Sequence, residues 1–402
     1  MSPSLLSVAE ARAQIVDDLA PVSTEHVKLA EALGRVLREA AVAQVSHPPA
    51  DVSAMDGYAV RAGDVEDVPK NLRVVGESAA GHPWPGHLGE GEAIRIFTGA
   101  MVPMSADTVV IQENTEAVGV TVTVKNVPRL AEHIRIMGSD FRTGDSILAA
   151  PRHLTARDVA LLAAMNLPRI TVSRKPRIGV LSTGDEVVMA GDVIGPGQIP
   201  SSNGPGLCAF ITAHGGEVTD LGNCKDDPAS LLRMAEQARH LDLLVTSGGV
   251  SVGDHDVVKG ALTDAGFKAG FHKVAMRPGK PLLYGRLHDL PVLGLPGNPV
   301  STMVCATLFL GSALEKLLGL AGSAPRTIAA RLAAPLKAND SRTDHLRATL
   351  HDDGDDLLTV RLAGVQDSAM IANLARADGL LIREPFTRAA AAGDVVRVIP
   401  LN

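Results

Sequence analysis

Short apolar runs alternate regularly with helical segments between Pro176 and Leu318, and this pattern restricts the fold more than any other feature of the sequence. Alternating strands and helices form a mainly parallel sheet whose two faces are covered by helices. The pattern therefore predicts a three-layer α/β domain. Its strands are expected at 177–182, 218–221, 241–246, 271–275, 281–284 and 292–295, and its helices at 204–214, 228–240, 257–265 and 299–318.

The sequence pattern of the residues before this domain changes twice. Ser7 and Glu10 form a capping-box pattern that predicts a helix near the N-terminus, and a second helix is expected over residues 25–39. From 51 to 136, short runs rich in Val and Ile are separated by Gly, Pro, Asn and Asp, which is typical of a β-rich domain. Helical structure resumes after a cap at Thr155, so the β-rich part is interpreted as an insertion.

The end of the chain has a different pattern. Beyond residue 324 apolar residues alternate with period two, as in Asp394–Ile399, and Asp352–Asp356 is typical of a hairpin turn. These features predict a small closing β domain. A chain of 402 residues exceeds the usual length of one domain, so several domains are expected.

Composition and charge exclude several classes of protein. Lys and Arg number 38 against 45 Asp and Glu, which gives a formal net charge of −7, and like charges form no block. Nucleic-acid binding is therefore not expected. The three cysteines have no short-spaced pair, which argues against a disulfide framework or a zinc site and fits a reducing cytoplasm.

Neither a membrane span nor an export signal is predicted. The longest near-apolar run, Met303–Leu314, is well short of the roughly 20 residues that cross a bilayer. Glu10, Arg12, Asp17 and Asp18 interrupt the region in which a signal peptide needs its apolar stretch. We expect a cytoplasmic protein.

Four loops follow strands of the α/β domain and carry polar residues, at 182–186, 226–227, 246–256 and 295–301. Ligands of parallel sheets bind at the carboxyl ends of the strands, so these loops are the candidate site. The glycines and hydroxyls of Thr246–Asp256 are suited to a phosphate cradle, and the helix that begins at Asn298–Pro299 directs free N–H groups to the same edge. A plain strand-to-helix turn and a well-capped helix remain alternative interpretations.

Charged residues in these loops and in the segment 273–281 indicate metal-dependent chemistry on an anion. Glu186, Asp226, Asp254 and Asp256 place carboxylates on one rim, where Mg²⁺ would reconcile them with an anionic ligand. Lys273, Arg277 and Lys280 supply positive charge, although a solvated basic loop has the same composition.

The β-rich segment carries three further polar clusters, around Asp56, Thr98 and Asp140. Each combines a carboxylate or a hydroxyl with glycine, and each taken alone is also typical of an ordinary turn. The histidines at 47, 82, 87 and 255 have no metal-like spacing.

These clusters, in this order, resemble the molybdopterin molybdenumtransferase family, the bacterial molybdenum-insertion enzymes that are also similar to the C-terminal domain of gephyrin. The resemblance covers essentially the whole chain. Any one segment is weak evidence for the family, but the eight segments in this order are highly specific for it. They are residues 53–60, 97–103, 135–145, 182–186, 226–228, 247–256, 277–281 and 295–301.

The resemblance implies a multidomain α/β plus β protein that forms a homodimer. Its pterin-binding domain is the three-layer α/β domain with the mainly parallel sheet. The implied domains are a discontinuous helical and mixed domain I at 1–22 and 141–173, a β-rich inserted domain II at 23–140, the α/β domain III at 174–323 and a small C-terminal β-barrel, domain IV, at 324–402.

The resemblance also implies an activity with its partners. The family transfers molybdenum from molybdate to adenylylated molybdopterin, requires Mg²⁺ and releases AMP. The implied active site lies between the α/β domain of one subunit and the β-rich domain of its partner. Contacts with molybdopterin adenylyltransferase and with apo-molybdoenzymes are expected, and contacts with nucleic acid or membrane are not.

Residue roles are carried over in the same way. Lys273 and Arg277 would neutralise molybdate and the departing phosphate, although Arg277 stands where the family also has Lys, and Arg is a forked donor. The catalytic set is Asp56, Thr98, Asp140, Glu186, Asp226, Asp256, Lys273 and Arg277, of which Glu186, Asp226 and Asp256 would hold Mg²⁺. The pterin-binding set is Thr183, Gly184, Ser247, Gly248, Gly249, Ser251, Lys280, Pro296, Gly297, Asn298 and Ser301.

Three other functions compete with this one. A molybdopterin adenylyltransferase shares the α/β domain, but the first 170 residues argue against it. A non-catalytic pterin-binding scaffold has no need of the carboxylates present in both halves of the implied site. A sugar-nucleotide enzyme lacks support because no strand is followed by a Gly-x-Gly-x-x-Gly fingerprint.

Overall fold

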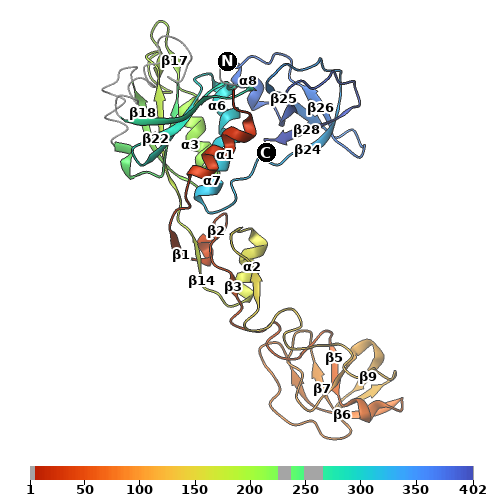
Figure 1. Cartoon of the computed structure of the whole chain (residues 1–402). Coiled ribbons are helices and arrows are strands. Elements are labelled where there is room, and N and C mark those ends of the chain that lie inside the picture. Colours follow the sequence, from red (N-terminus) through yellow and green to blue (C-terminus); the bar gives the residue numbers. More distant parts are fainter. Residues whose placement is uncertain (1–4, 225–236, 249–265, 402) are drawn as a thin grey trace. The chain divides into compact units, whose positions relative to one another are not determined.

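A computed structural model describes residues 5–224, 237–248 and 266–401 of the chain (Figure 1). The chain divides into two compact units, one built from residues 1–25 and 173–402 and the other from residues 26–172. The second unit is thus inserted into the first in sequence, and it includes residues 141–172 together with the β-rich segment.

The first unit is organised around a six-stranded sheet. In spatial order its strands are β18 (Glu217–Cys224), β15 (Arg177–Thr183), β19 (Leu243–Ser247), β23 (Leu290–Leu295), β22 (Pro281–Leu287) and β20 (Phe267–Lys273). The first four strands pair with one another in parallel, whereas β22 pairs antiparallel with both β23 and β20. The predicted mainly parallel sheet is therefore confirmed. The predicted helix at 257–265 lies outside the described residues, as does most of the one at 228–240, which ends in the 3-10 turn η4 (Ala238–His240).

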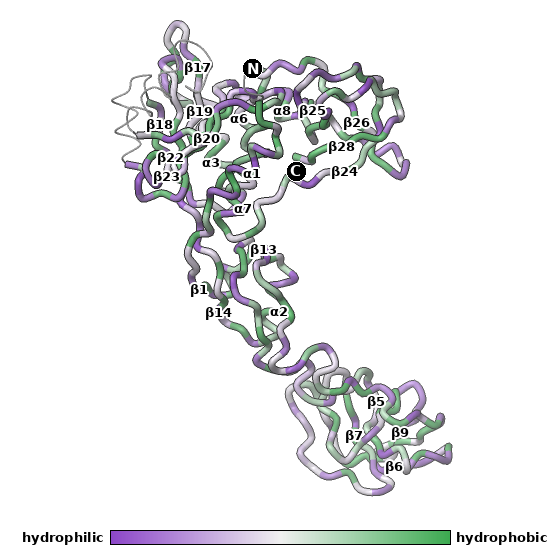
Figure 2. The backbone as a smooth tube through the Cα atoms, viewed as in Figure 1, coloured by the Kyte–Doolittle hydropathy of each residue, from purple (hydrophilic) through white to green (hydrophobic). Residues whose placement is uncertain are grey.

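The inner strands β15, β19 and β23 are buried on both faces because their side chains alternate between two apolar cores. In β15, Ile178 and Val180 belong to the larger core and Leu181 to the smaller one. Figure 2 shows hydrophobic colour along the sheet and its helices and hydrophilic colour in many outer turns. The larger core is closed by α1 (Val8–Asp18), α3 (Asn203–Ala213), α6 (Pro299–Cys305), the π-helical turn η5 (Ala306–Leu310) and α7 (Gly311–Leu317).

The helix ends follow local signals in the sequence. The Ser7 hydroxyl accepts the Glu10 N–H at 3.2 Å and the Glu10 carboxylate accepts the Ser7 N–H at 2.8 Å, which confirms the capping box. The helix predicted at Pro299 begins there. Residues 299–317 are long and apolar enough to cross a membrane, but 72% of their most apolar stretch is buried inside the protein, as in a core helix.

A closed five-stranded barrel forms the end of the chain, as predicted. Its strands in order are β25 (Thr343–His351), β26 (Thr359–Leu362), β24 (Ile328–Leu332), β28 (Val395–Pro400) and β27 (Gly379–Arg383), and β27 pairs back to β25. The predicted hairpin turn at 352–356 joins β25 to β26. Leu380 and Ile399 belong to the large core of the α/β domain, which anchors the barrel there. The short strand β21 (Met276–Arg277) also pairs with β25.

The helix predicted over residues 25–39 is wrong. This segment forms β1 (Thr24–Lys28), the 3-10 turn η1 (Leu29–Glu31) and β2 (Val36–Leu37). Gly34 adopts a φ of 74°, which interrupts a helix, and the Arg38 N–H donates to the Thr171 carbonyl at 3.0 Å. Pairing with distant residues therefore outweighs the local helical propensity.

These strands pair with residues on the far side of the β-rich segment. One sheet has the order β1, β14 (Arg169–Ser173), β2 and β13 (Arg152–His153), and a second joins β3 (Ala41–Val42) to β12 (Ser146–Leu148). Helix α2 (Ala156–Ala164) packs on the same core, whereas α1 packs in the α/β core. The boundaries expected at residues 22 and 140 do not follow this pairing, because long-range strand pairs leave no trace in local spacing.

The rest of the second unit is the predicted β-rich structure. Its six-stranded sheet has the order β8 (Thr108–Ile111), β5 (Gly57–Val60), β7 (Glu92–Ile96), β6 (Lys70–Ser78), β10 (Thr121–Val124) and β9 (Thr115–Val118). Beside it, β4 (Val52–Ser53) pairs with β11 (Ile134–Arg135), and the 3-10 turns η2 (Ala62–Val65) and η3 (Gln112–Asn114) join strands. Apolar side chains from both sheet faces form two separate clusters.

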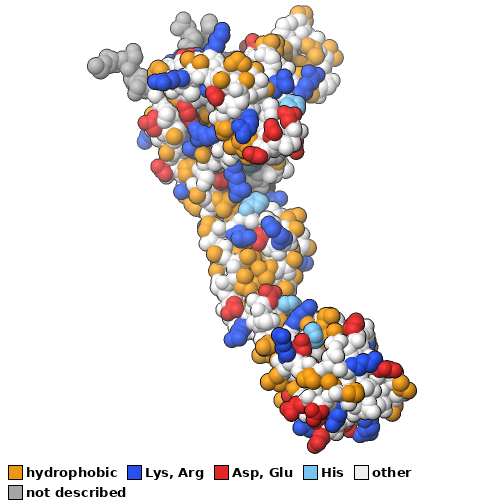
Figure 3. All heavy atoms as spheres, turned by 90° about the vertical axis from the view of Figure 1, so that its right-hand side faces the viewer, with side chains coloured by type: hydrophobic (Ala, Val, Ile, Leu, Met, Phe, Trp, Pro, Cys, Tyr) orange, Lys and Arg blue, Asp and Glu red, His pale blue; other side chains and the backbone are white. Residues whose placement is uncertain are grey.

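Charged side chains of both signs are interspersed on the face drawn in Figure 3. A nucleic-acid surface would gather Lys and Arg into a patch. The face shown has no such patch, in agreement with the net charge of −7.

The buried cap of α2 predicts a pH-dependent contribution to stability. Burial would raise the pKa of Asp158, but the Thr155 N–H, the Arg152 guanidinium and the Thr155 hydroxyl together lower it to about 2. We expect Asp158→Asn to lower the free energy of unfolding by about 1–2 kcal/mol at pH 7. The contribution is complete above the unfolded pKa of about 3.9 and is lost as the pH falls through the folded value.

Urea denaturation of the full chain at several pH values measures this difference. The gap in midpoint between wild type and Asp158→Asn should close between about pH 4 and pH 2. Asp353→Asn, in an exposed turn, serves as the control. Equal midpoints for Asp158→Asn and wild type at pH 7 would contradict the prediction.

Candidate active site

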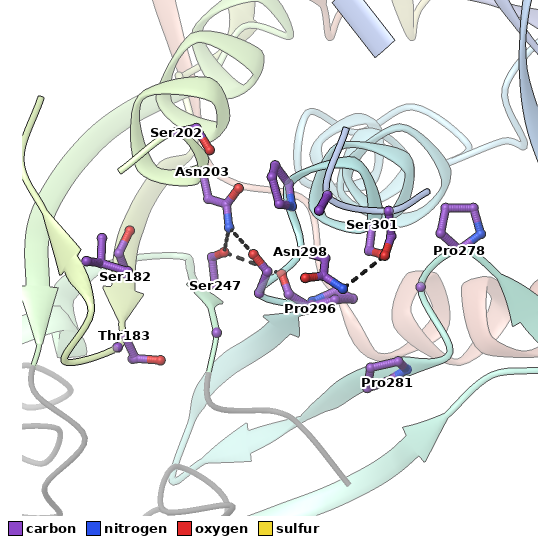
Figure 4. A pocket seen from close by; sticks show the side chains of 18 of the residues that line it. Ser182, Thr183, Ser202, Asn203, Ser247, Pro278, Pro281, Pro296, Asn298 and Ser301 are labelled. Atoms are coloured by element: carbon purple, nitrogen blue, oxygen red, sulfur yellow. Dashed lines mark hydrogen bonds between the residues drawn. The ribbon is translucent and has the colours of Figure 1, made fainter. Parts of the chain in front are cut away.

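A pocket of about 750 Å³ opens at the carboxyl ends of β15, β19 and β23, where the sequence predicted the ligand site. Its volume is in the range of small-molecule sites. Figure 4 shows Ser182 and Thr183 from the end of β15, Ser247 from the end of β19 and Asn298 from the loop after β23 around it. The predicted site residues that line the pocket are Thr183, Gly184, Glu186, Ser247, Gly248, Arg277, Lys280, Pro296, Gly297, Asn298 and Ser301.

The other predicted residues are located elsewhere. Lys273 ends β20 and is not among the lining residues. Asp56, Thr98 and Asp140 belong to the inserted unit. Asp226, Gly249, Ser251 and Asp256 lie outside the described residues.

Glycines let the loops of the pocket come close together. Gly248 has a φ of 94°, and a Cβ there would stand 2.5 Å from the Thr183 carbonyl oxygen. A Cβ on Gly297 would stand 3.5 Å from the Gly248 Cα, so the loops after β19 and β23 are in contact. Glycine permits this close backbone approach, and across it the Gly248 N–H donates to the Leu295 carbonyl at 3.2 Å.

The start of α6 differs in one respect from the prediction. Asn298 occupies the N-cap position, but its side chain makes no cap hydrogen bond. Its Nδ2 donates instead to the Ser368 hydroxyl at 2.9 Å, and the Val300 N–H donates to the Ser368 carbonyl at 3.1 Å. One N–H of the first turn is therefore already paired with the barrel domain.

Arg277 is held by two carboxylates of the barrel domain. Its Nη2 lies 2.7 Å from the Asp340 carboxylate and its Nε 2.9 Å from that of Asp344. Burial raises the pKa of Asp344, whereas hydrogen bonds from Arg342 lower the pKa of Asp340. The guanidinium is thus fixed in position at the rim of the pocket.

Several residues that line the pocket were not predicted from the sequence. Arg342, Gln366 and Ser368 come from the barrel domain, and no local signal connects them to the α/β loops. Asn203, at the start of α3, was detectable as the polar residue that opens the predicted helix at 204–214.

In the inserted unit the structure brings two of the predicted catalytic residues together. The Asp56 carboxylate accepts the Thr98 N–H at 2.7 Å and the Thr98 hydroxyl at 2.9 Å. The Thr98 N–H, then its hydroxyl, lower the pKa of Asp56. Arg95 stacks on the Tyr58 and Phe97 rings at 5.1 and 4.8 Å and adds positive charge near the carboxylate.

Asp140 is exposed in the same unit. Its N–H donates to the His47 carbonyl at 3.1 Å. Within residues 5–224, 237–248 and 266–401, His, Cys, Asp and Glu form no group of three that could hold a metal ion.

Comparison with protein families agrees with this geometry along the chain. Residues 6–166 match the MoeA N-terminal region (domain I and II), residues 179–316 a probable molybdopterin binding domain, and residues 329–401 the MoeA C-terminal region (domain IV). The chain belongs to the molybdopterin molybdenumtransferase family. It is therefore a transferase of molybdenum cofactor biosynthesis with a molybdopterin-binding domain.

Individual relatives of this transferase cover most or nearly all of the chain. A molybdopterin molybdenumtransferase of Haemophilus influenzae is 34% identical over 403 residues, which are 99% of both chains. One from a Nostoc species is 37% identical over 368 residues, which are 89% of this chain and 84% of the relative. The crystal structure of a molybdopterin biosynthesis MoeA protein from Pyrococcus horikoshii superposes with a TM-score of 0.83 at 31% identity, covering 99% of this chain and 100% of that one.

The contact between loops predicts that this molybdenumtransferase does not tolerate a side chain at Gly248. We expect Gly248→Ala to weaken molybdopterin binding more than tenfold and to lower the melting temperature, because the new Cβ overlaps the Thr183 carbonyl. Binding followed by pterin fluorescence and thermal unfolding measure the two effects.

Gly354 provides the matched control. It has a φ of 84°, and a Cβ at this position would have nothing within 4 Å, so Gly354→Ala carries only the conformational cost of about 1 kcal/mol. If Gly248→Ala binds molybdopterin as wild type does, the contact does not shape the pocket.

Proposed function

We propose that the transferase inserts molybdenum from molybdate into adenylylated molybdopterin and releases AMP. The observation that carries the proposal is the pocket at the carboxyl ends of β15, β19 and β23, lined by hydroxyls, glycine loops and basic side chains. Such a lining suits a phosphorylated anion. AMP leaves when water adds to phosphorus and the phosphoanhydride bond breaks.

The pterin phosphate would lie on the loops that follow β19 and β23. Ser247 and Gly248 at the end of β19, and Gly297 and Ser301 after β23, line the pocket there. Gly249 and Ser251 continue the first loop in the sequence and complete the proposed cradle. In the first turn of α6, Pro299 has no N–H and those of Val300 and Thr302 are paired, so the Ser301 N–H is the one that would reach the phosphate.

Basic residues would neutralise the charge of the two anions. Lys280 is exposed and lines the pocket, and Lys273 lies on the neighbouring strand β20. Arg277 is oriented by Asp340 and Asp344, so its remaining N–H groups have a fixed direction. These cations would neutralise molybdate and the departing phosphate.

Mg²⁺ is the proposed metal, held by Glu186 with Asp226 and Asp256. Glu186 is exposed at the pocket, and the side-chain polar atoms of Ser182 and Thr183, which also line it, are oxygens like those of Glu186. This donor chemistry fits a hard cation. When bound, Mg²⁺ would offset the charge of the pyrophosphate oxygens.

Asp56, Thr98 and Asp140 would complete the site from a partner subunit. Asp56 is held by Thr98, and its lowered pKa keeps it ionised at neutral pH. We propose a homodimer in which the inserted unit of one subunit faces the pocket of the other. Contacts with molybdopterin adenylyltransferase and apo-molybdoenzymes, in the cytoplasm, follow from a substrate and a product that are both reactive pterins.

The decisive experiment measures AMP release from adenylylated molybdopterin and Mg²⁺, with and without molybdate. Release that requires molybdate supports the proposed reaction. Pterin binding without release would instead favour a scaffold, and adenylylation of bare molybdopterin with ATP would favour an adenylyltransferase. Matches to the regions flanking the pterin domain argue for the transferase over both.

A shared site predicts complementation between two inactive variants. We expect Asp56→Asn and Glu186→Gln each to lower molybdate-dependent AMP release at least a hundredfold as homodimers. A heterodimer of the two keeps one site in which both residues are intact, so it should recover about half of the wild-type rate. Two affinity tags on co-expressed chains isolate the heterodimer. A heterodimer as inactive as its parents would place both residues in the same subunit's site or remove the dimer from the mechanism.

A further inference from the structure

Two asparagine side chains hold the loops of the pocket in the same way. Each uses its amide nitrogen to donate to two acceptors. Asn203 Nδ2 donates to the Ser247 hydroxyl at 2.8 Å and to the Gly297 carbonyl at 2.7 Å (Figure 4). Asn223 Nδ2 donates to the Gly184 carbonyl at 3.1 Å and to the Val187 carbonyl at 2.9 Å.

Asn203 joins three segments at the binding loops. It begins α3, Ser247 ends β19, and Gly297 follows β23. The orientation of its amide is determined because the Gly297 carbonyl can only accept a hydrogen bond. Asn203 therefore ties the start of a helix to the two loops that would hold the pterin phosphate.

Asn223 acts on a different loop, and a β-bulge directs it there. Val180 of β15 pairs with Asp220 of β18, but Ser182 pairs with Asn223, so β18 holds one extra residue. Gly222, in this bulge, has a φ of 76°. Bulges change the direction in which the following side chains point. The acceptors of Asn223, Gly184 and Val187, are the two ends of the turn that carries Glu186.

Both amides have a buried Oδ1 with no hydrogen-bond partner among the residues that the structure describes. A buried acceptor left unpaired costs free energy. The described contribution of each asparagine therefore comes from its donor nitrogen, because its Oδ1 forms no described hydrogen bond. Aspartate, which has the same shape, cannot make these donations.

We propose that Asn203 and Asn223 are positioning residues with separate tasks. Asn203 fixes the loops at Ser247 and Gly297 and so sets the affinity for the pterin. Asn223 fixes the turn at Gly184–Val187 and so sets the position of Glu186 for the chemical step. The second task rests on the proposed role of Glu186, whereas the first rests only on the proposed binding of the pterin at the loops after β19 and β23.

The isosteric variants separate the two tasks. Asn203→Asp should raise the KM for adenylylated molybdopterin about tenfold and change kcat less than about twofold. Asn223→Asp should lower kcat about tenfold or more and leave KM within about twofold. Equilibrium binding of adenylylated molybdopterin without molybdate, followed by pterin fluorescence, should be weakened about tenfold only by Asn203→Asp.

Further variants distinguish positioning from added charge and from misfolding. Asn203→Ala and Asn223→Ala should shift the same parameters in the same direction, and the double Asp variant should combine both effects multiplicatively. Asn126→Asp makes the same chemical change at an exposed residue of the inserted unit and should match wild type. Circular dichroism and the melting temperature confirm that each variant is folded.

Three results would overturn the inference. One is equal loss of binding and turnover in both asparagine variants, which a general loosening of the fold would produce. Another is an effect of the Asp variants that the Ala variants lack, since charge and not position would then be responsible. The third is unchanged binding by Asn203→Asp. If the wild-type enzyme bound the pterin without releasing AMP, the proposed reaction would fail, but the binding arm would still test Asn203.

Discussion

The pocket depends on the burial of both faces of the central sheet. Ile178 and Val180 point into one core and Leu181 into the other, so the strands are fixed from both sides. Parallel strands held in this way end at one common edge. Loops separated by more than a hundred residues, at Thr183 and Gly297, are brought together there by the sheet alone. The sheet alone brings the polar residues of those loops together. Their own contacts only fix their exact positions.

The barrel domain fixes the positions of polar residues on one side of the pocket. Leu380 and Ile399 bury its outer face in the α/β core, and this apolar contact fixes the docking. Polar contacts then follow at the rim, where Arg277 meets Asp340 and Asp344 and Asn298 meets Ser368. Exposed ion pairs contribute little to stability, so their effect lies in orientation. The C-terminal domain is therefore part of the pocket wall and not only an appended module.

Local signals in the sequence predicted local structure well. The capping box at Ser7 and Glu10 and the helix start at Pro299 are formed by residues close in the chain, and both are confirmed. The helix expected over 25–39 failed because its residues pair with strands near 152 and 172. The site residues also divide into those with a local sequence signal and those brought in by long-range packing. Gly248 and Asn298 belong to recognisable loops after strands, whereas Arg342 and Gln366 reach the pocket only through the docking of the barrel. Long-range packing of this kind is not encoded in spacing.

The environment of Asp56 limits the chemistry that the inserted unit can supply. Its carboxylate receives two hydrogen bonds from Thr98, and the first of these, from the backbone N–H, is the largest cause of its lowered pKa. A carboxylate stabilised in its charged form is a poor proton donor at neutral pH. Because the Thr98 hydroxyl donates to Asp56, that hydroxyl turns its lone pairs outward. The outward side of the pair therefore carries oxygen lone pairs, beside the positive charge of Arg95. In the other unit, Arg277 and Lys280 supply positive charge to the lining of the pocket.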